Sequence, residues 1–307
     1  MEKQVNRPIF VVGSPRSGTS ILTWCLGQHP NIFPVPESNW MGDFGVNLAL
    51  SHQVGTARGD RAILSAMAIG RDEFFAHFGR SINQLILAHR ADLNRKRKMP
   101  ASTEPKTRWV DGTPEYSTHI FALRQLFPEA VFVHIVRDVR EVVRSMLNFH
   151  RVAGTQLVPN EEEAYKYWLR TVRACVQAEQ AYGPEIVRRF AYNALIDNPE
   201  AAMRALFEFV GEEYDQRSLD PLGQRINSSK VPPDFVADDP ATDRAIVEQA
   251  LLLSAELMEN RQPHGRSASA AKAMEAEFEQ RVQYAAGLDR AYRDCRRKLK
   301  KFETAKV

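Results

Sequence analysis

The sequence has few cysteines, and those that it has are far apart. Cys25, Cys175 and Cys295 show no metal-ligand spacing, and an odd number of them leaves no closed disulfide framework. The chain also lacks any apolar run that approaches the length of a membrane span, and its first apolar segment begins too early to leave room for a signal peptide. These absences argue against a disulfide scaffold, a membrane-spanning protein and a protein-bound metal, and they favour a reducing compartment.

Charge of one sign is not in large excess either. The 41 Lys and Arg residues against 38 Asp and Glu residues give a formal net charge of +3, which is too small to indicate a nucleic-acid partner. The small excess suits a pocket for an anionic ligand. With 307 residues, 44% of them hydrophobic and 26% charged, the chain is long enough to bury a sizeable core in one large domain.

A glycine-containing turn near the N-terminus is the strongest local signal. Residues 9–12 are large and apolar and stop at Gly13, which predicts a buried strand that enters a tight turn. Gly18 and the start of an apolar helix follow, and such a turn before a helix N-terminus binds anions. The spacing of Gly13 and Gly18 matches that of a nucleotide-triphosphatase loop. However, Thr19 stands where that loop has its Lys, and the only cation in this turn is Arg16. An ordinary ATPase or GTPase loop is therefore disfavoured.

A second buried strand is predicted at residues 131–136, which are nearly all apolar. Arg137 follows it directly, and Ser145 lies on the helix expected next, so an arginine fork and a hydroxyl can share one phosphate there. Taken by itself, Arg137 beside Asp138 is better explained as an ion pair at the strand end. His134, inside the strand, is expected to be a core histidine with its polar atoms satisfied.

The run from Pro15 to Ser20, Pro-Arg-Ser-Gly-Thr-Ser, resembles the 5′-phosphosulfate loop of the sulfotransferases that use 3′-phosphoadenosine-5′-phosphosulfate (PAPS). The continuation to His29-Pro30 and Glu37 is most similar to the tyrosylprotein sulfotransferase branch and its bacterial relatives. The resemblance implies sulfuryl transfer from PAPS to a hydroxyl or amine, with Glu37 as general base and Arg16 stabilising the departing phosphate. The cofactor contacts that it implies are Ser14, Pro15, Arg16, Ser17, Gly18, Thr19, Ser20, Arg137, Ser145, Tyr192, Ser229 and Lys230.

Several of these positions have simpler explanations. Glu37 by itself is better explained as a solvated loop glutamate or a helix-cap partner. Tyr192 is equally well explained as a packing residue, and Ser229 with Lys230 as part of a surface loop. The segment 109–116 resembles a family segment that carries a Lys where this chain has Gly112. We expect Lys106 or Arg108 to reach in instead, or Arg16 and the loop amides to suffice.

The expected fold class is α/β of the P-loop type, with a central parallel sheet and helices on both faces. Residues 1–262 form the sulfotransferase-like domain, in which a helical insertion at about 43–105 is expected, by family analogy, to shape the acceptor pocket. Residues 263–307 read as a linker followed by one long amphipathic helix with a seven-residue apolar repeat and a basic end. This helix is expected either to pack back on its own domain or to pair with a second subunit as a homodimer.

Two other functions stay open. One is an ATP-dependent phosphotransferase, because the two families share a loop and a sheet, and the other is a catalytically inactive nucleotide-binding relative. The motifs do not identify the acceptor, so carbohydrates, lipids, peptides and small natural products all remain candidates. Family members of the secretory pathway usually carry an N-terminal anchor, and the absence of an anchor here predicts a cytoplasmic protein.

Overall fold

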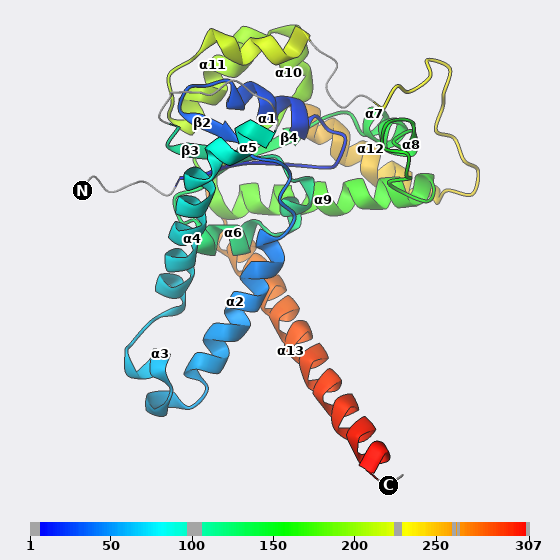
Figure 1. Cartoon of the computed structure of the whole chain (residues 1–307). Coiled ribbons are helices and arrows are strands. Elements are labelled where there is room, and N and C mark those ends of the chain that lie inside the picture. The colour runs from blue at the N-terminus through cyan, green and yellow to red at the C-terminus, as the bar shows by residue number, and fades with distance from the viewer. Residues whose placement is uncertain (1–6, 97–105, 224–228, 260–261, 263–264, 305–307) are drawn as a thin grey trace.

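A parallel sheet lies among the helices of the chain (Figure 1). It has five strands in the order β2-β3-β1-β4-β5. This computed structural model describes residues 7–96, 106–223, 229–259, 262 and 265–304. The expected α/β class with a parallel sheet is confirmed. The strands are β1 (Ile9–Val12), β2 (Ile32–Pro34), β3 (Arg108–Asp111), β4 (Val131–Val136) and β5 (Val187–Ala191).

Helices cover both faces of the sheet because side chains alternate along each strand. Phe10 and Val12 join a core with one set of helices, whereas Ile9 and Val11 join a separate core with another. The first set is α2 (Met41–Thr56), α4 (Arg71–Ala88), α6 (Ile120–Leu126), α9 (Glu161–Tyr182) and α13 (Ala268–Thr304). The second set is α1 (Thr19–Gly27), α10 (Tyr192–Asp197), α11 (Pro199–Val210) and the 3-10 helix η3 (Gln216–Gly223).

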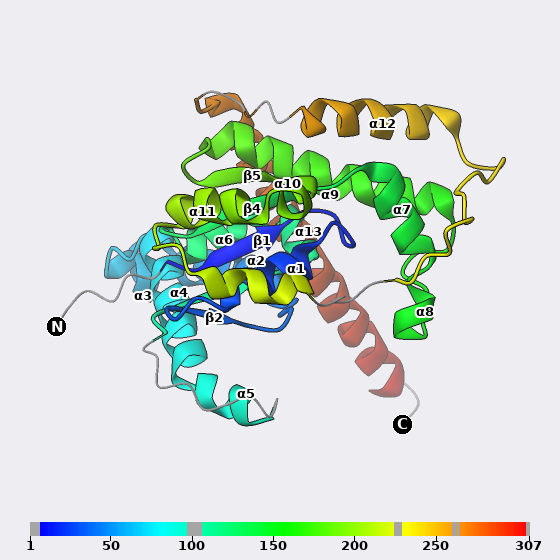
Figure 2. The same cartoon turned by 90° about the horizontal axis from the view of Figure 1, so that it is seen from above.

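A third core lies beyond the carboxyl end of β4, where α7 (Val139–Leu147) and α12 (Arg244–Met258) pack on α9 (Figure 2). The remaining helices are short connectors. They are η1 (Gly59–Arg61), α3 (Ile63–Ala66), α5 (Arg90–Lys96), η2 (Pro114–Thr118) and α8 (His150–Ala153). None of the described helices is both long and apolar enough to cross a membrane.

Side-chain caps set the starts of the two helices that follow the site. Asp138 accepts hydrogen bonds from the backbone N–H groups of Arg140 and Glu141 at 2.9 and 3.3 Å and so begins α7. The explanation of Arg137 and Asp138 as an ion pair is therefore wrong, because Asp138 caps the helix and Arg137 pairs with Glu141 instead. Asn160 caps α9 in the same way.

His134 is buried in the core, as expected, but its polar atoms are not all satisfied, because its Nε2 has no hydrogen-bond partner among the described residues. Its Nδ1 lies 2.6 Å from Oε1 of Glu179 on α9, and Arg189 of β5 contacts the same carboxylate. This buried cluster links β4 and β5 to α9. Removal of one member would be destabilising, because it would leave a buried charge without its partner.

The amino half of the C-terminal helix α13 packs back on the domain. Met274, Phe278 and Val282 are buried in the core that α9, α2 and α6 share. The carboxyl half extends away from the sheet (Figure 1), and Leu288 and Tyr292 of the apolar repeat are 54% and 61% exposed. Packing back is thus confirmed for the amino half, while pairing with a second subunit stays a prediction.

Candidate active site

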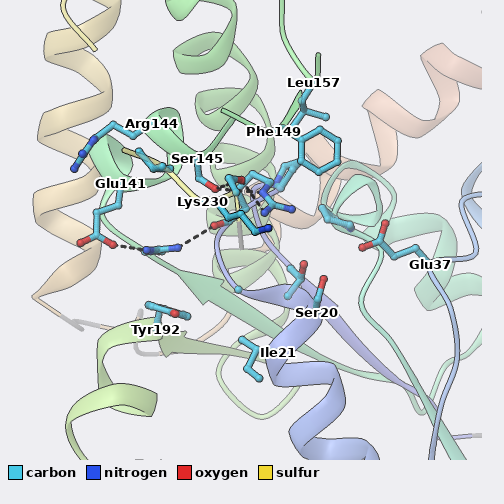
Figure 3. A pocket seen from close by; sticks show the side chains of 18 of the residues that line it. Ser20, Ile21, Glu37, Glu141, Arg144, Ser145, Phe149, Leu157, Tyr192 and Lys230 are labelled. Carbon is cyan, nitrogen blue, oxygen red and sulfur yellow. Dashed lines mark hydrogen bonds and ion pairs between the residues drawn. The ribbon is translucent and has the colours of Figure 1, made fainter. Parts of the chain in front are cut away.

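A pocket of about 660 Å³ lies across the carboxyl ends of the strands (Figure 3), where parallel α/β sheets bind ligands. The segment that follows each of the five strands contributes to its wall, so the sheet order gathers residues from the whole domain. We call it the strand-end pocket. Its charged side chains are Arg16, Arg137, Arg144 and Lys230 with Glu37, Glu115 and Glu141.

The turn after β1 is held rigidly under this pocket. The N–H of Gly13 donates to Ser117 Oγ at 2.9 Å, and the same hydroxyl lies 2.9 Å from the Gly13 carbonyl. Gly13 has φ 149°, and a Cβ there would come within 2.5 Å of the Ile135 carbonyl oxygen. Gly18 has φ 105°, and a Cβ there would meet the ring of Tyr192 at 2.6 Å. Both positions therefore require glycine.

Arg16 joins the turn to two segments that are distant in sequence. Its Nη2 donates to Ser229 Oγ at 2.9 Å and its Nε to Ser145 Oγ at 3.3 Å, while the two hydroxyls lie 2.9 Å apart. The guanidinium also lies over the Phe149 ring at 4.9 Å from its centroid. The structure thus brings together three residues that the motifs predicted separately, and Arg16 takes a left-handed backbone conformation (φ 71°) to do so.

Arg137 lies on the neighbouring wall, at the end of β4. Its Nε donates to Glu141 at 2.7 Å, and its guanidinium lies 4.5 Å from the centroid of the Tyr192 ring. Burial and the nearby charge of Arg137 lower the pKa of Arg16, and the carboxylate of Glu37 opposes them. Two cations close together without enough opposing charge make a site that favours an anion.

The other predicted contacts separate into two groups. Pro15, Gly18, Thr19, Ser20, Tyr192 and Lys230 line the strand-end pocket. Ser14 and Ser17 lie under the turn, where Ser14 Oγ donates to the Pro15 carbonyl at 3.3 Å. The buried Ser17 hydroxyl has no hydrogen-bond partner among the described residues. Residues 224–228, which begin the predicted Ser-x-Ser-Lys loop, lie outside the described residues.

Glu37 enters the pocket from the side opposite Glu141 and Tyr192 (Figure 3). Partial burial of its carboxylate raises its pKa, Glu115 and Asp111 raise it further, and Arg16 opposes them. A carboxylate with a raised pKa that faces a cationic wall has the properties of a general base.

The neighbouring residue, Ser38, fixes the position of Glu37. Its N–H donates to Thr113 Oγ1 at 2.9 Å, and its hydroxyl donates to the buried carboxylate of Asp111 at 2.7 Å and contacts Tyr116. The sequence interpretation missed the role of Ser38, Asp111 and Thr113 in positioning Glu37. It compared segment 109–116 only with a family segment whose Lys neutralises charge. The available signal was a row of polar residues just after a strand, where site residues gather.

The predicted substitutes for the missing Lys do not reach the site. Lys106 Nζ donates to the carbonyls of His29 and Ile32 at 2.9 Å each. Arg108 pairs with Glu212 at 2.8 Å. Both lie at the amino end of β3, the opposite edge of the sheet, so this prediction is wrong.

Gly112 is instead a contact point between β3 and α1. A Cβ at this position would lie 2.2 Å from Thr23 Oγ1. A side chain at this position would require Thr23 to move, and this contact disfavours a Lys there.

A model of the sulfotransferase family matches residues 8–216. An uncharacterized protein of Aquifex aeolicus is 27% identical over 216 residues, which are 70% of this chain and 26% of that protein. A putative protein-tyrosine sulfotransferase of Caenorhabditis briggsae is 24% identical over 212 residues, 69% of this chain and 68% of that protein. The sulfotransferase domain of the Synechococcus olefin synthase has 21% identity and a TM-score of 0.48, with 84% and 96% of the two chains covered.

Proposed function

The chain belongs to the sulfotransferase family, and from this membership we propose that it moves the sulfuryl group of PAPS to a hydroxyl or amine of an acceptor. One observation supports the proposal most: Arg16, bound to Ser145 and Ser229, faces Glu37 across one pocket. Cationic anchors for two phosphate groups and a base therefore share a single space.

The size and lining of the strand-end pocket support PAPS as the donor. Its volume of about 660 Å³ lies within the range of roughly 300–1,000 Å³ that is usual for ligand pockets. The turn amides, the N-terminus of α1 and the Ser20 hydroxyl would hold the 5′-phosphosulfate. Arg137, Ser145, Ser229 and Lys230 would hold the 3′-phosphate, and Tyr192 would contact the nucleotide.

The transfer needs one proton acceptor and one source of positive charge. Glu37 takes the proton of the acceptor hydroxyl as that oxygen bonds to sulfur, and the electrons of the breaking sulfur–oxygen bond pass to the departing phosphate. Arg16 and the turn amides then stabilise the negative charge on that phosphate. Ser38 keeps Glu37 in place, which aligns base and acceptor.

The two rival functions are weaker on structural grounds. An ATP-dependent phosphotransferase would need a cation at the start of α1, but the pocket-facing residues there are Thr19, Ser20 and Ile21. An inactive relative would be expected to lose its base, whereas Glu37 is present and its neighbour Ser38 is held by Asp111 and Thr113.

Calorimetric binding of adenosine 3′,5′-bisphosphate, the spent donor, tests the proposal, with ATP·Mg²⁺ as the competing ligand. We expect the bisphosphate to bind and outcompete ATP, and Arg137→Ala to weaken it by about 2 kcal/mol or more, because a phosphate loses its charged partner. Arg80→Ala, an exposed arginine on α4, is the matched control. Binding of ATP·Mg²⁺ without binding of the bisphosphate would support the phosphotransferase instead. Bisphosphate binding without turnover on any acceptor would indicate the inactive relative.

A further inference from the structure

A second pocket, of about 470 Å³, lies beside the strand-end pocket. Its walls come from η2, α9 and the amino half of α13, and we call it the lateral groove. Glu115 of η2 lines both pockets, so the two spaces meet at this residue. The other charged or aromatic side chains of the groove are His119, Tyr167, Arg170, Arg173, Glu277 and Arg281.

Glu115 also contacts a side chain of the lateral groove. The hydroxyl of Tyr167 donates to Glu115 Oε1 at 2.8 Å. Burial, that hydrogen bond and the charges of Glu115 and Glu37 all raise the pKa of Tyr167. Glu115 and Glu37 both line the strand-end pocket, so a molecule that extends from the lateral groove past Glu115 enters the pocket of the proposed base.

The arginines of the lateral groove differ in how their charge is compensated. Arg281 of α13 pairs with Glu277 at 2.7 Å and also donates to the Thr118 carbonyl at 2.7 Å. Arg173 donates to the neutral amide of Gln249 at 2.9 Å, and Arg170 lies over the Tyr167 ring at 4.7 Å from its centroid. Within the described part of the chain, neither Arg170 nor Arg173 has a carboxylate partner.

Their spacing along α9 sets a length scale. Arg170 and Arg173 follow Tyr167 by three and six residues, which correspond to about 4.5 and 9 Å along the helix axis. Both side chains are exposed, so an anionic group that enters the groove meets them without any rearrangement of the core.

We propose that the lateral groove binds the acceptor, and that Arg170 and Arg173 select acceptors with an anionic group about 5 to 10 Å from the hydroxyl that is sulfated. This proposal rests on the proposed function and names the substrate class for it. Arg281 closes one side of the groove, which gives the C-terminal helix a role in the site. No described residue of the 43–105 insertion lines either pocket, so the groove departs from the family expectation for that insertion.

Two phenols of equal shape and different charge test the groove. The full-length chain is titrated with 4-hydroxyphenylacetate and with 4-hydroxyphenylacetamide, followed by ligand-observed NMR, both without and with adenosine 3′,5′-bisphosphate. We expect the carboxylate to bind about five-fold more tightly, since exposed arginine–carboxylate pairs contribute modestly. The double variant Arg170→Gln/Arg173→Gln should remove that preference, whereas Arg80→Gln on α4 should keep it.

Kinetics with PAPS distinguish a failure of the acceptor assignment from a failure of the proposed function. The double variant should raise KM for the carboxylate phenol and leave kcat, and the affinity for the bisphosphate, unchanged. Equal binding of the two phenols, no binding of the carboxylate, or a preference that survives in the double variant would each overturn the acceptor assignment. If the unmodified chain does not bind the bisphosphate, the proposed function is contradicted instead. The titrations of the two phenols without bisphosphate would still measure binding in the lateral groove.

Discussion

Arg16 and Ser229 are 213 positions apart in the sequence, yet Nη2 of the arginine donates to the serine hydroxyl at 2.9 Å. This hydrogen bond joins the turn after β1 to the segment that closes the strand-end pocket. Ser145 contacts both partners, so three segments share one small polar cluster. The cluster couples the two ends of the proposed nucleotide site.

The first prediction concerns this coupling. Ser229→Ala should weaken binding of adenosine 3′,5′-bisphosphate by about tenfold, because a hydrogen bond to a charged group is lost. Arg16→Ala should weaken it more, and the double variant should cost less than the sum of the two, as residues in contact are not additive. Calorimetry of the four proteins measures this, with Ser51→Ala on α2 as the control. Additive losses would show that the two side chains act independently.

The second prediction concerns the base. Glu37→Gln should lower kcat by about 100- to 10,000-fold, the range for loss of a general base, and leave bisphosphate affinity nearly unchanged. The measurement is release of bisphosphate from PAPS with any acceptor that turns over in the unmodified chain. Bisphosphate affinity that falls together with kcat would indicate that Glu37 serves binding.

The third prediction concerns the direction in which the reaction rate changes with pH. The pKa of Glu37 is raised, chiefly by burial and then by Glu115, and the base must be deprotonated to act. The rate therefore rises with pH through this raised pKa, and activity is lost as the pH falls below it. Glu115→Gln removes a like charge, so the acid limb of the rate profile should move to lower pH. Glu129→Gln, an exposed residue outside both pockets, should leave it in place.

The fourth prediction concerns Gly112. Gly112→Ala should lower the free energy of unfolding by about 1–3 kcal/mol, because the new Cβ overlaps Thr23 Oγ1 in a tightly packed core. Thr23→Ala in the same chain should recover part of the loss, since it removes that oxygen. Urea denaturation of the single and double variants measures both effects. Gly70→Ala is the control, as a Cβ there meets nothing within 4 Å. No recovery in the double variant would mean that the β3 backbone itself cannot accept a side chain.

Much of the fold was readable from local sequence. The apolar runs at 9–12 and 131–136 predicted β1 and β4, because these signals depend on neighbours in the chain. The strand β3 was not predicted. Its sequence is Arg108-Trp109-Val110-Asp111, so only two of its residues are apolar. The segment becomes a strand because it pairs with β1 on one side and β2 on the other.

The sequence by itself determined the chemistry of this protein: a glycine turn with Arg16, an arginine and a serine after a buried strand, and a glutamate on an extended segment. Only the tertiary structure decided what those groups touch. The parallel sheet order brings the carboxyl ends of all five strands to one edge, so Ser38 meets Asp111 and Arg16 meets Ser229. The lateral groove arises in the same way, because α13 packs on α9 although about a hundred residues separate them.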